Sequence, residues 1–376
     1  MVDVIFLFIR NGRDSMADLT HGGDIYSARE KGARNIIDFS ANINPLGLPE
    51  RVKEAIIQGL DTCVHYPDPL CRELTSAIAD FEQVPAEFII CGNGAADIIF
   101  RMTLACKPKQ AIVLAPTFAE YETALESVGC QVNHYFLEEQ KNFRLNDEFI
   151  ASLTSDIEMV FLCNPNNPTG QLMERSLLEQ IARICEEKNI WLVLDECFMD
   201  FVHQYDQYSM KEFLTQYKNM IILKAFTKNF AMPGIRLGYG MTSNGNLLHK
   251  LSSVGQPWSV SIPAQLAGVQ ALKEKDYIEK SFQSLTQEKE YLVSELNKLR
   301  IKYYAPAANY ILLNLINIEK TRENFDFKEE LFKQGILIRD CSNYEGLEKG
   351  YYRIAIKSHE DNEKLIHILN SMQLNI

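Results

Sequence analysis

Apolar and polar residues follow one another along this chain in blocks that predict alternating strands and helices. Apolar runs of strand length lie at residues 88–91, 111–114, 159–163, 191–195 and 220–223. Helical periodicity covers residues 49–60, 70–81 and 174–188. Continuous apolar runs are typical of strands buried on both faces, and helices between them favour parallel connections. The pattern therefore predicts an α/β fold with a mostly parallel central sheet.

The last third of the chain has a different pattern. Long helical patterns at 262–273 and 275–299 precede strands at 310–315, 336–339 and 351–356 and helices at 326–334 and 359–373. This order predicts a smaller α+β domain. We therefore expect an N-terminal extension and arm over 1–48, a large α/β domain over 49–265 and a small C-terminal domain over 266–376.

Composition and charge narrow the function classes. The chain has 376 residues, 46% hydrophobic and 23% charged, which is typical of a globular protein. Its net charge of −12 argues against nucleic acid or an anionic membrane as a general partner. The apolar run Val4–Ile9 is too short for a membrane span, and residues before about His21 are expected to form a loosely held extension. Nine cysteines without a C-x-x-C pair favour reduced thiols in the cytoplasm, and no metal site is expected.

The first candidate for chemistry is Lys228, which follows the apolar strand 220–223 and precedes a Pro-Gly turn. A desolvated lysine has a lowered pKa, so its neutral amine can react with a carbonyl. Arg236, eight residues further on, offers a planar fork suited to phosphate. The pair indicates an aldehyde-bearing phosphorylated cofactor, pyridoxal phosphate (PLP). A solvated surface lysine is the alternative interpretation of Lys228.

Asp195 supports the cofactor interpretation because it ends the strand 191–195. Ligands of open α/β sheets lie outside the carboxyl ends of the strands. A carboxylate there can pair with a protonated pyridine nitrogen, which makes the ring an electron sink. A helix N-cap or an isolated surface acid is the alternative for Asp195.

Further candidates for ligand contacts lie on predicted strands or directly after them. Residues 92–97, G-N-G-A-A-D, enter a helix whose free N–H groups can bind an anion. Phe118 follows the strand 111–114, where a ring can stack on a cofactor or belong to the core. Asn167 lies in N-P-N-N-P-T-G, a rigid turn that aims an amide side chain or simply turns the chain. Arg339 and Arg353 on predicted strands each require an internal acid, such as Asp340, or a ligand anion.

Together these motifs resemble the fold type I PLP-dependent enzymes of the class I/II aminotransferase superfamily, over nearly the whole chain from His21. The resemblance implies that Lys228 links covalently to the cofactor and that Asp195 holds its ring nitrogen. It also implies that Asn167 bonds the phenolic oxygen and that Arg236 binds the phosphate.

The same resemblance implies a second set of cofactor contacts. Backbone amides that bind the phosphate would come from Gly94, Ala95 and Ala96, and Phe118 would stack on the ring. Tyr66, in Y-P-D, would reach the cofactor phosphate of a partner subunit. A homodimer with shared active sites is therefore expected.

More specific motifs resemble the threonine-phosphate decarboxylase branch of the histidinol-phosphate aminotransferase group, which serves cobalamin assembly. They are H-G-G-D (21–24), D-F-S-A-N-I-N-P-L-G (38–47), F-A-E-Y (118–121), P-W-S-V (257–260), the segment 336–347 and Y-Y-R-I-A-I-K-S (351–358). The implied reaction removes CO2 from L-threonine O-3-phosphate and gives (R)-1-aminopropan-2-yl phosphate. Residues expected to bind this substrate are His21, Asn42, Asn167, Asn309, Arg339 and Arg353.

Three positions depart from the superfamily pattern. Ala225 and Ala96 stand where hydroxyl residues are common, and Phe198 stands where many aminotransferases carry a tyrosine. The hydroxyls missing at Ala225 and Ala96 are expected to weaken cofactor binding by about 1 kcal/mol each unless water replaces them, and Phe198 lacks the hydroxyl that would bond the phenolic oxygen. Two alternatives to the decarboxylase remain: a histidinol-phosphate-type aminotransferase that uses 2-oxoglutarate, and a non-catalytic PLP-binding regulator. The regulator would normally carry a DNA-binding region, and no helix-turn-helix pattern precedes His21.

Overall fold

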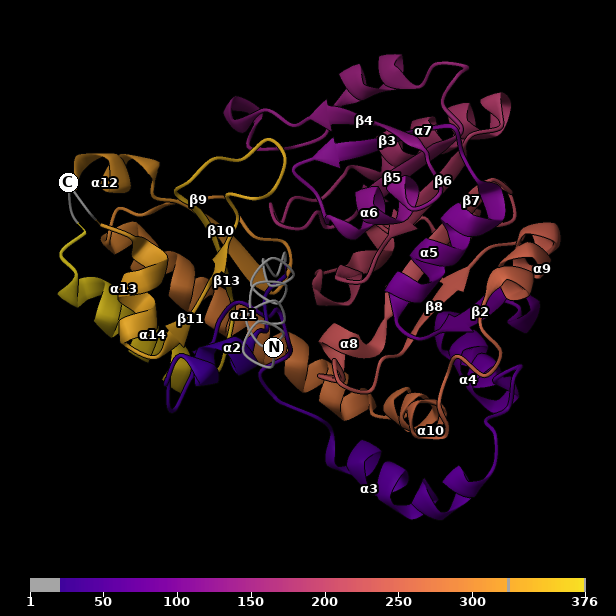
Figure 1. The fold of residues 1–376 in the computed structure, drawn as a ribbon, viewed down its shortest axis with the longest axis horizontal. Coiled ribbons are helices and arrows are strands. Elements are labelled where there is room, and N and C mark those ends of the chain that lie inside the picture. The colour runs from indigo at the N-terminus through magenta and orange to yellow at the C-terminus, as the bar shows by residue number, and fades with distance from the viewer. Residues whose placement is uncertain (1–20, 323–324, 375–376) are drawn as a thin grey trace, which may run out of the picture.

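The computed structural model describes residues 21–322 and 325–374, which form a large and a small part (Figure 1). The expected N-terminal extension before His21 lies outside the described residues. Among the helices that are described, none has the length and apolar character needed to cross a membrane.

The large part is built on a seven-stranded sheet with the order β2-β8-β7-β6-β5-β3-β4. Its strands are β2 (Ile89–Gly92), β3 (Gln110–Ala115), β4 (Gln131–Phe136), β5 (Met159–Cys163), β6 (Trp191–Asp195), β7 (Met220–Ala225) and β8 (Gly238–Met241). Neighbouring strands are parallel except at β8, which is antiparallel to both β2 and β7. The predicted mostly parallel α/β sheet is therefore confirmed.

Helices cover both faces of this sheet, and alternate residues of each strand pack into one or the other of the two apolar cores. On β5, Val160 and Leu162 belong to one apolar cluster, whereas Met159 and Phe161 belong to another. Burial on both faces explains why these strands are continuous apolar runs. The helices of this part are α3 (Glu50–Gly59), α4 (Arg72–Glu82), α5 (Ala95–Cys106), α6 (Glu120–Glu126), α7 (Arg175–Lys188), α8 (Phe226–Asn229), α9 (Gly245–Val254) and α10 (Ile262–Ala271).

The small part has its own sheet and its own apolar cluster. The antiparallel sheet has the order β12 (Arg339–Asp340), β13 (Tyr351–Ala355), β10 (Tyr310–Asn314), β9 (Lys302–Tyr303). Its helices are α11 (Lys275–Lys298), α12 (Ile316–Thr321), α13 (Phe327–Lys333) and α14 (His359–Ser371). The N-terminal arm joins this part, because β1 (Ile37–Asp38), after α2 (Ile25–Glu30), pairs in parallel with β11 (Ile336–Leu337). Short 3₁₀ helices lie at 60–64, 86–88, 139–141, 147–152, 199–201, 205–207 and 211–213.

Two sequence predictions need correction. The single strand expected at 336–339 is wrong, because β11 pairs with β1 while β12 pairs with β13, and Ile338 lies between them. The pattern also gave no sign of β4 or β8. β4 is an edge strand of mixed polarity, and β8 is rich in glycine. Glycine is needed at position 238, because a Cβ there would stand 2.4 Å from the backbone nitrogen of Ala95.

Candidate active site

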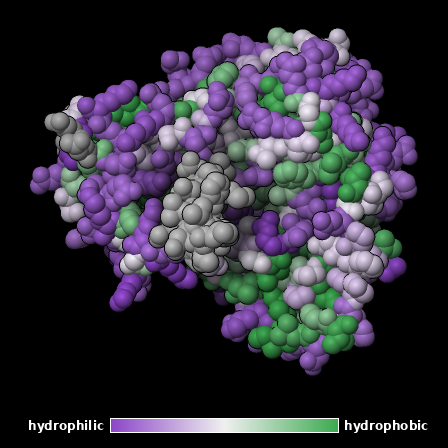
Figure 2. All heavy atoms as spheres, viewed as in Figure 1, coloured by the Kyte–Doolittle hydropathy of each residue, from purple (hydrophilic) through white to green (hydrophobic). Residues whose placement is uncertain are grey.

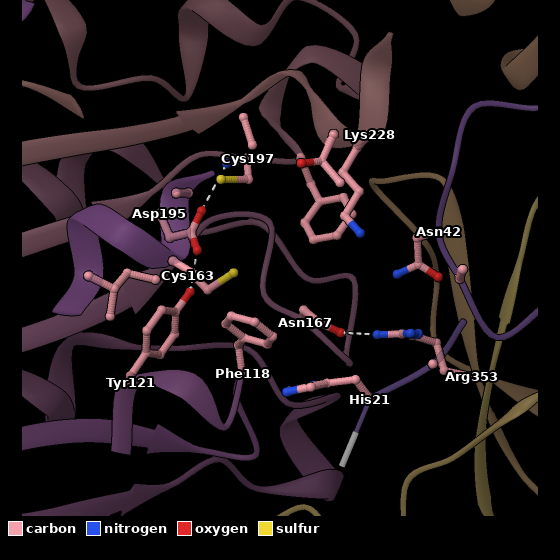
Figure 3. Close-up of a pocket in the computed structure, with 18 of the residues that line it drawn as sticks. His21, Asn42, Phe118, Tyr121, Cys163, Asn167, Asp195, Cys197, Lys228 and Arg353 are labelled. Atoms are coloured by element: carbon pink, nitrogen blue, oxygen red, sulfur yellow. Dashed lines mark hydrogen bonds between the residues drawn. The ribbon is translucent and has the colours of Figure 1, made fainter. Parts of the chain in front are cut away.

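A cavity of about 220 Å³ opens at the carboxyl ends of the central strands, where the large part faces β13 and the N-terminal arm (Figure 3). Most residues that the sequence predicted for the site line it. They are His21, Asn42, Ala95, Ala96, Phe118, Asn167, Asp195, Lys228, Arg236 and Arg353. The cavity therefore brings together side chains that are far apart in the sequence, as expected for a sheet whose strands end at one edge.

Lys228 lies in the short helix α8, directly after β7, and its amine points into the cavity (Figure 3). Its Nζ stands 5.8 Å from the centroid of the Phe198 ring. Burial lowers the pKa of Lys228 to about 8, and the positive charges of Arg353 and Arg236 add to the effect. The lowered pKa expected from the sequence is confirmed. A neutral amine is thus available near physiological pH for reaction with an aldehyde.

This pKa predicts how cofactor-free protein takes up its cofactor. Only the neutral amine attacks a carbonyl, so the rate of covalent PLP incorporation should rise with pH to a plateau with a midpoint of about 8. Stopped-flow absorbance at fixed PLP concentration between pH 6 and 10 measures the midpoint. A rate that keeps rising towards about 10.4, the ordinary lysine pKa, would contradict the assignment.

Asp195 ends β6 and is held by two donors. The Tyr121 hydroxyl donates to its Oδ2 at 2.6 Å, and the backbone N–H of Cys197 donates to its Oδ1 at 3.0 Å (Figure 3). Burial and the negative charge of Asp195 raise the pKa of Tyr121 well above its usual value, so the phenol remains a donor. Asp195 also lines the cavity, where a carboxylate can accept a bond from a protonated ring nitrogen.

The N-terminus of α5 and Arg236 form a cradle for an anion. Ala95 and Ala96, the first residues of α5, line the cavity, and the first N–H groups of a helix lack partners within it. Gly94 does not line the cavity, but a Cβ there would stand 2.7 Å from a guanidinium nitrogen of Arg236. A glycine at position 94 therefore allows the guanidinium to lie against the loop.

The cavity wall contains the three positions at which this sequence departs from the superfamily pattern. Ala225 and Ala96 both line the cavity without a hydroxyl, but Thr227 lines it as well. Phe198 packs edge-to-face on Tyr310 with ring centroids 4.9 Å apart. Phe198 therefore supplies an apolar surface beside Lys228 where a tyrosine would supply a hydroxyl.

Arg353 projects from β13 at the opposite wall. Its guanidinium donates to Oδ1 of Asn167 and, at 2.8 Å, to the backbone oxygen of Ser40. Within residues 21–322 and 325–374, three buried polar atoms near this wall have no hydrogen-bond partner: Nε of Arg353 and Oδ1 of Asn42 and Asn309. Buried polar atoms are normally paired, so this wall fits a polar ligand with an anionic group for Arg353 and donor groups for the two amide oxygens.

His21 enters the cavity from the arm. Its Nε2 lies 2.6 Å from Oε1 of Glu120, and its ring centroid lies 5.6 Å from that of Phe118 (Figure 3). Gly22 is needed at the next position, because a Cβ there would stand 2.0 Å from the backbone oxygen of Ser40. The two glycines after His21 thus let the arm cross the segment that contains Ser40 and Asn42.

Three other predicted residues do not line this cavity. Asn309 is buried behind it and donates to the backbone oxygen of Asn42 at 3.2 Å. Tyr66 is 77% exposed and stacks on Trp258 with centroids 4.5 Å apart. Arg339 lines a second cavity of about 570 Å³, which shares His21, Gly22 and Ser40 with the first. Its guanidinium donates to the backbone oxygen of Asp340 and, at 2.7 Å, to Oδ1 of Asn343.

The sequence assigned no role to three cavity residues that surround Asp195, namely Tyr121, Cys163 and Cys197. A signal for Tyr121 was available, because it lies three residues after Phe118 at the start of a helix and so shares its face. Cys163 is paired with Asp195 across β5 and β6, which only the strand register reveals.

The functional groups that line the cavity fit the chemistry of PLP. A neutral lysine amine, a buried carboxylate and a helix N-terminus with an arginine match its aldehyde, ring nitrogen and phosphate. On a mostly parallel sheet with a smaller α+β part, they define a fold type I PLP-dependent enzyme.

Comparison with known proteins supports this class. The family Aminotransferase class I and II matches residues 34–369. The chain is 39% identical to the threonine-phosphate decarboxylase of Salmonella typhimurium, over 94% of this chain and 96% of that protein. It is 30% identical to an adenosylcobalamin biosynthesis bifunctional protein of Leptospira interrogans, over 94% of this chain and 41% of that longer protein. The crystal structure of the histidinol-phosphate aminotransferase from Clostridium acetobutylicum superposes with a TM-score of 0.82 at 32% identity, covering 90% and 99% of the two chains. This chain therefore belongs to the aminotransferase class I and II family, and its cofactor is PLP.

Proposed function

We propose that this protein decarboxylates L-threonine O-3-phosphate to (R)-1-aminopropan-2-yl phosphate in cobalamin biosynthesis. The observation that carries the proposal is the 39% identity to a threonine-phosphate decarboxylase over nearly the full length of both chains. The similarity to an adenosylcobalamin biosynthesis protein supports the pathway. A histidinol-phosphate-type aminotransferase is the second candidate, which the likeness to the Clostridium acetobutylicum enzyme favours.

In this proposal each part of the cofactor is held by different residues of the cavity. Lys228 would bind its aldehyde carbon covalently, and Asp195 would accept a hydrogen bond from its ring nitrogen. Arg236 and the N–H groups at the start of α5, at Gly94, Ala95 and Ala96, would hold the phosphate. Phe118 would pack against the ring, and Asn167 would donate to the phenolic oxygen. When bound, PLP supplies an electron-withdrawing ring that stabilises negative charge at the substrate Cα.

The remaining residues orient the substrate and move a proton. Arg353 would bind the carboxylate, because its guanidinium is buried in the cavity wall and its Nε has no hydrogen-bond partner among the residues that the structure describes. Asn42 and Asn309 carry buried acceptor oxygens beside it, and His21 closes the side towards Phe118. Arg353 would orient the substrate so that the bond to the carboxylate is the one that breaks, and the Lys228 amine, once the substrate amine has taken its place on the cofactor, would deliver a proton to Cα.

Turnover without an acceptor tests the reaction class. Purified protein with PLP and threonine phosphate, but no keto acid, should release CO2 and the amino phosphate in equal amounts. An aminotransferase needs an amino acceptor for each cycle, so turnover that occurs only with 2-oxoglutarate would overturn the decarboxylase. Visible absorbance with no turnover of either kind would favour the non-catalytic regulator.

Arg339 is proposed to bind the substrate phosphate from the adjoining cavity. Replacing it with glutamine should reduce the preference for phosphorylated over plain threonine by about 10–100-fold, the effect of losing one hydrogen bond to a charged group. The kcat/KM ratio of the two substrates measures this preference. Lys31→Gln is the matched control, because Lys31 lines the same cavity from the end of α2. A preference unchanged by Arg339→Gln would remove the phosphate role.

We further propose a cytoplasmic homodimer with shared active sites. Figure 2 shows apolar side chains gathered over the region of α3, and the exposed apolar residues in and after this helix include Ile57, Leu60, Val64, Tyr66 and Leu70. Contiguous exposed apolar surface is typical of a subunit interface. Tyr66 lies on this surface, where it could reach a partner's cofactor phosphate. The nine free thiols support a reducing compartment.

The dimer predicts a mass of twice 43.0 kDa by sedimentation equilibrium. Val64→Glu should shift the mass towards the monomer, because it places a charge in the buried interface. Phe136→Glu is the control, since Phe136 is an exposed apolar residue on the edge strand β4, away from the surface around α3. A parent protein that sediments as a monomer at micromolar concentration would refute the shared site.

The domain boundaries stay a proposal as well, with an arm over 1–48, a large domain over 49–265 and a small domain over 266–376. One apolar cluster lies mostly within the small part, although Phe198 and Phe201 of the large part also belong to it, and Leu312 and Tyr351 of the small part belong to the cluster of the large part. Phe39 of the arm packs into the cluster of the small part, and Tyr277 at the start of α11 packs against that of the large part. These contacts tie the three segments together.

A further inference from the structure

Tyr121 makes a contact at the floor of the cavity that the division of roles above does not use. Its hydroxyl donates to Oδ2 of Asp195 at 2.6 Å, and both side chains are buried. The burial that raises the pKa of Tyr121 keeps the proton on the phenol. This bond is thus a permanent, charge-assisted one in a site of low polarity, where such bonds are strong.

The surroundings fix the position of this hydroxyl. The Tyr121 ring stacks on Phe161 with centroids 5.0 Å apart and an interplanar angle of 14°. Phe118 meets its edge at 5.5 Å. Since the side chain is fully buried between these rings, the hydroxyl has little freedom to leave Asp195.

The other oxygen of the carboxylate is fixed independently. The backbone N–H of Cys197 donates to Oδ1 at 3.0 Å, and the Cys197 thiol also hydrogen-bonds to Asp195. With at least one donor on each oxygen, the plane of the carboxylate is set before any ligand binds. Removing Tyr121 alone would free Oδ2 while leaving Oδ1 anchored.

We propose that Tyr121 is a positioning residue that sets the orientation and basicity of Asp195, and so keeps the proton shared with the cofactor on the ring nitrogen. A carboxylate that accepts hydrogen bonds is a weaker base than one that does not. Without the Tyr121 hydroxyl, Asp195 gains proton affinity and draws the shared proton away from the ring. The inference rests on the proposed function only in that Asp195 meets the ring nitrogen, and it holds for either candidate substrate.

The test is the ¹⁵N chemical shift of the ring nitrogen in protein loaded with ¹⁵N-labelled PLP, without substrate. The parent should give the signal of a protonated pyridine nitrogen. Tyr121→Phe should move it towards the unprotonated value and raise the Kd for PLP by about tenfold, the effect of losing a hydrogen bond to a charged group. A parental ¹⁵N shift in folded Tyr121→Phe would overturn the proposal.

Two further variants separate this role from a structural one. Tyr304→Phe removes a similar bond, since the buried Tyr304 donates to Oε1 of Glu139 at 2.6 Å away from the cavity. It should leave the ¹⁵N shift unchanged. Tyr121→Leu also lacks a donor and must move the signal in the same direction as Tyr121→Phe, so a parental shift there would equally overturn the proposal. Because no substrate is added, failure of the threonine-phosphate assay does not affect this result.

Discussion

Replacing Lys228 with alanine is expected to abolish turnover, with kcat lowered by at least about 10⁴-fold, the upper range for loss of a positioned acid or base. The same variant should hold no cofactor that borohydride can fix to the chain, because the amine that binds the aldehyde is gone. Peptide mass mapping after reduction checks the attachment point, and CO2 release checks the rate.

A matched control is available in Lys289. Burial also lowers the pKa of Lys289 to about 8, but this residue lies in α11 outside the cavity and donates to the backbone oxygen of Ala307 at 3.0 Å. Lys289→Ala should keep both the covalent cofactor and most of the turnover. If reduction fixed the cofactor to Lys289, or if Lys228→Ala kept its activity, the site would be misassigned.

The second large effect is expected at Asp195. Asp195→Asn keeps the size of the side chain but removes the charge opposite the ring nitrogen. Turnover should fall by on the order of 10²–10³-fold, as when one electrostatic contact is removed from a buried reaction site. The cofactor should still be attached through Lys228, so absorbance per subunit should be retained while kcat falls.

Glu196 provides the control for this substitution. It is the next residue and is buried, but it binds Ser209 and the backbone N–H of Met210 and does not line the cavity. Burial raises its pKa to about 7, so a glutamine there resembles its protonated form. Glu196→Gln should leave kcat near the parental value. Equal losses from both substitutions would indicate a structural rather than an electronic role for Asp195.

Much of the fold was predictable because local pattern and long-range packing agree. The strand 159–163 is apolar throughout since both its faces meet helices, and the structure places β5 there. β8 could not be predicted from an apolar pattern, because Gly238 and Gly240 lie where other segments of the same chain approach the strand closely. The segment 336–340 is divided into two strands because its first two residues pair with β1 and its last two pair with β13.

The site was predictable where chemistry follows directly after a strand. Asp195 ends β6 and Lys228 follows the neighbouring parallel strand β7, so the rule that ligands lie at the carboxyl edge places them together. Arg339 lies on a strand and lines the adjoining cavity rather than the first one. No local sequence pattern indicates which of the two cavities its side chain enters. Tyr121 was missed because its partner, Asp195, is set by strand register and helix packing rather than by spacing.

The fate of the hydrogen on the substrate Cα tests the proposed reaction most directly. With L-threonine O-3-phosphate that carries deuterium at Cα, decarboxylation breaks the bond to the carboxylate and leaves the deuterium in place. We expect an amino phosphate that retains this deuterium and gains one solvent hydrogen on the same carbon, as seen by NMR. Loss of the deuterium to water together with formation of a keto acid would contradict it.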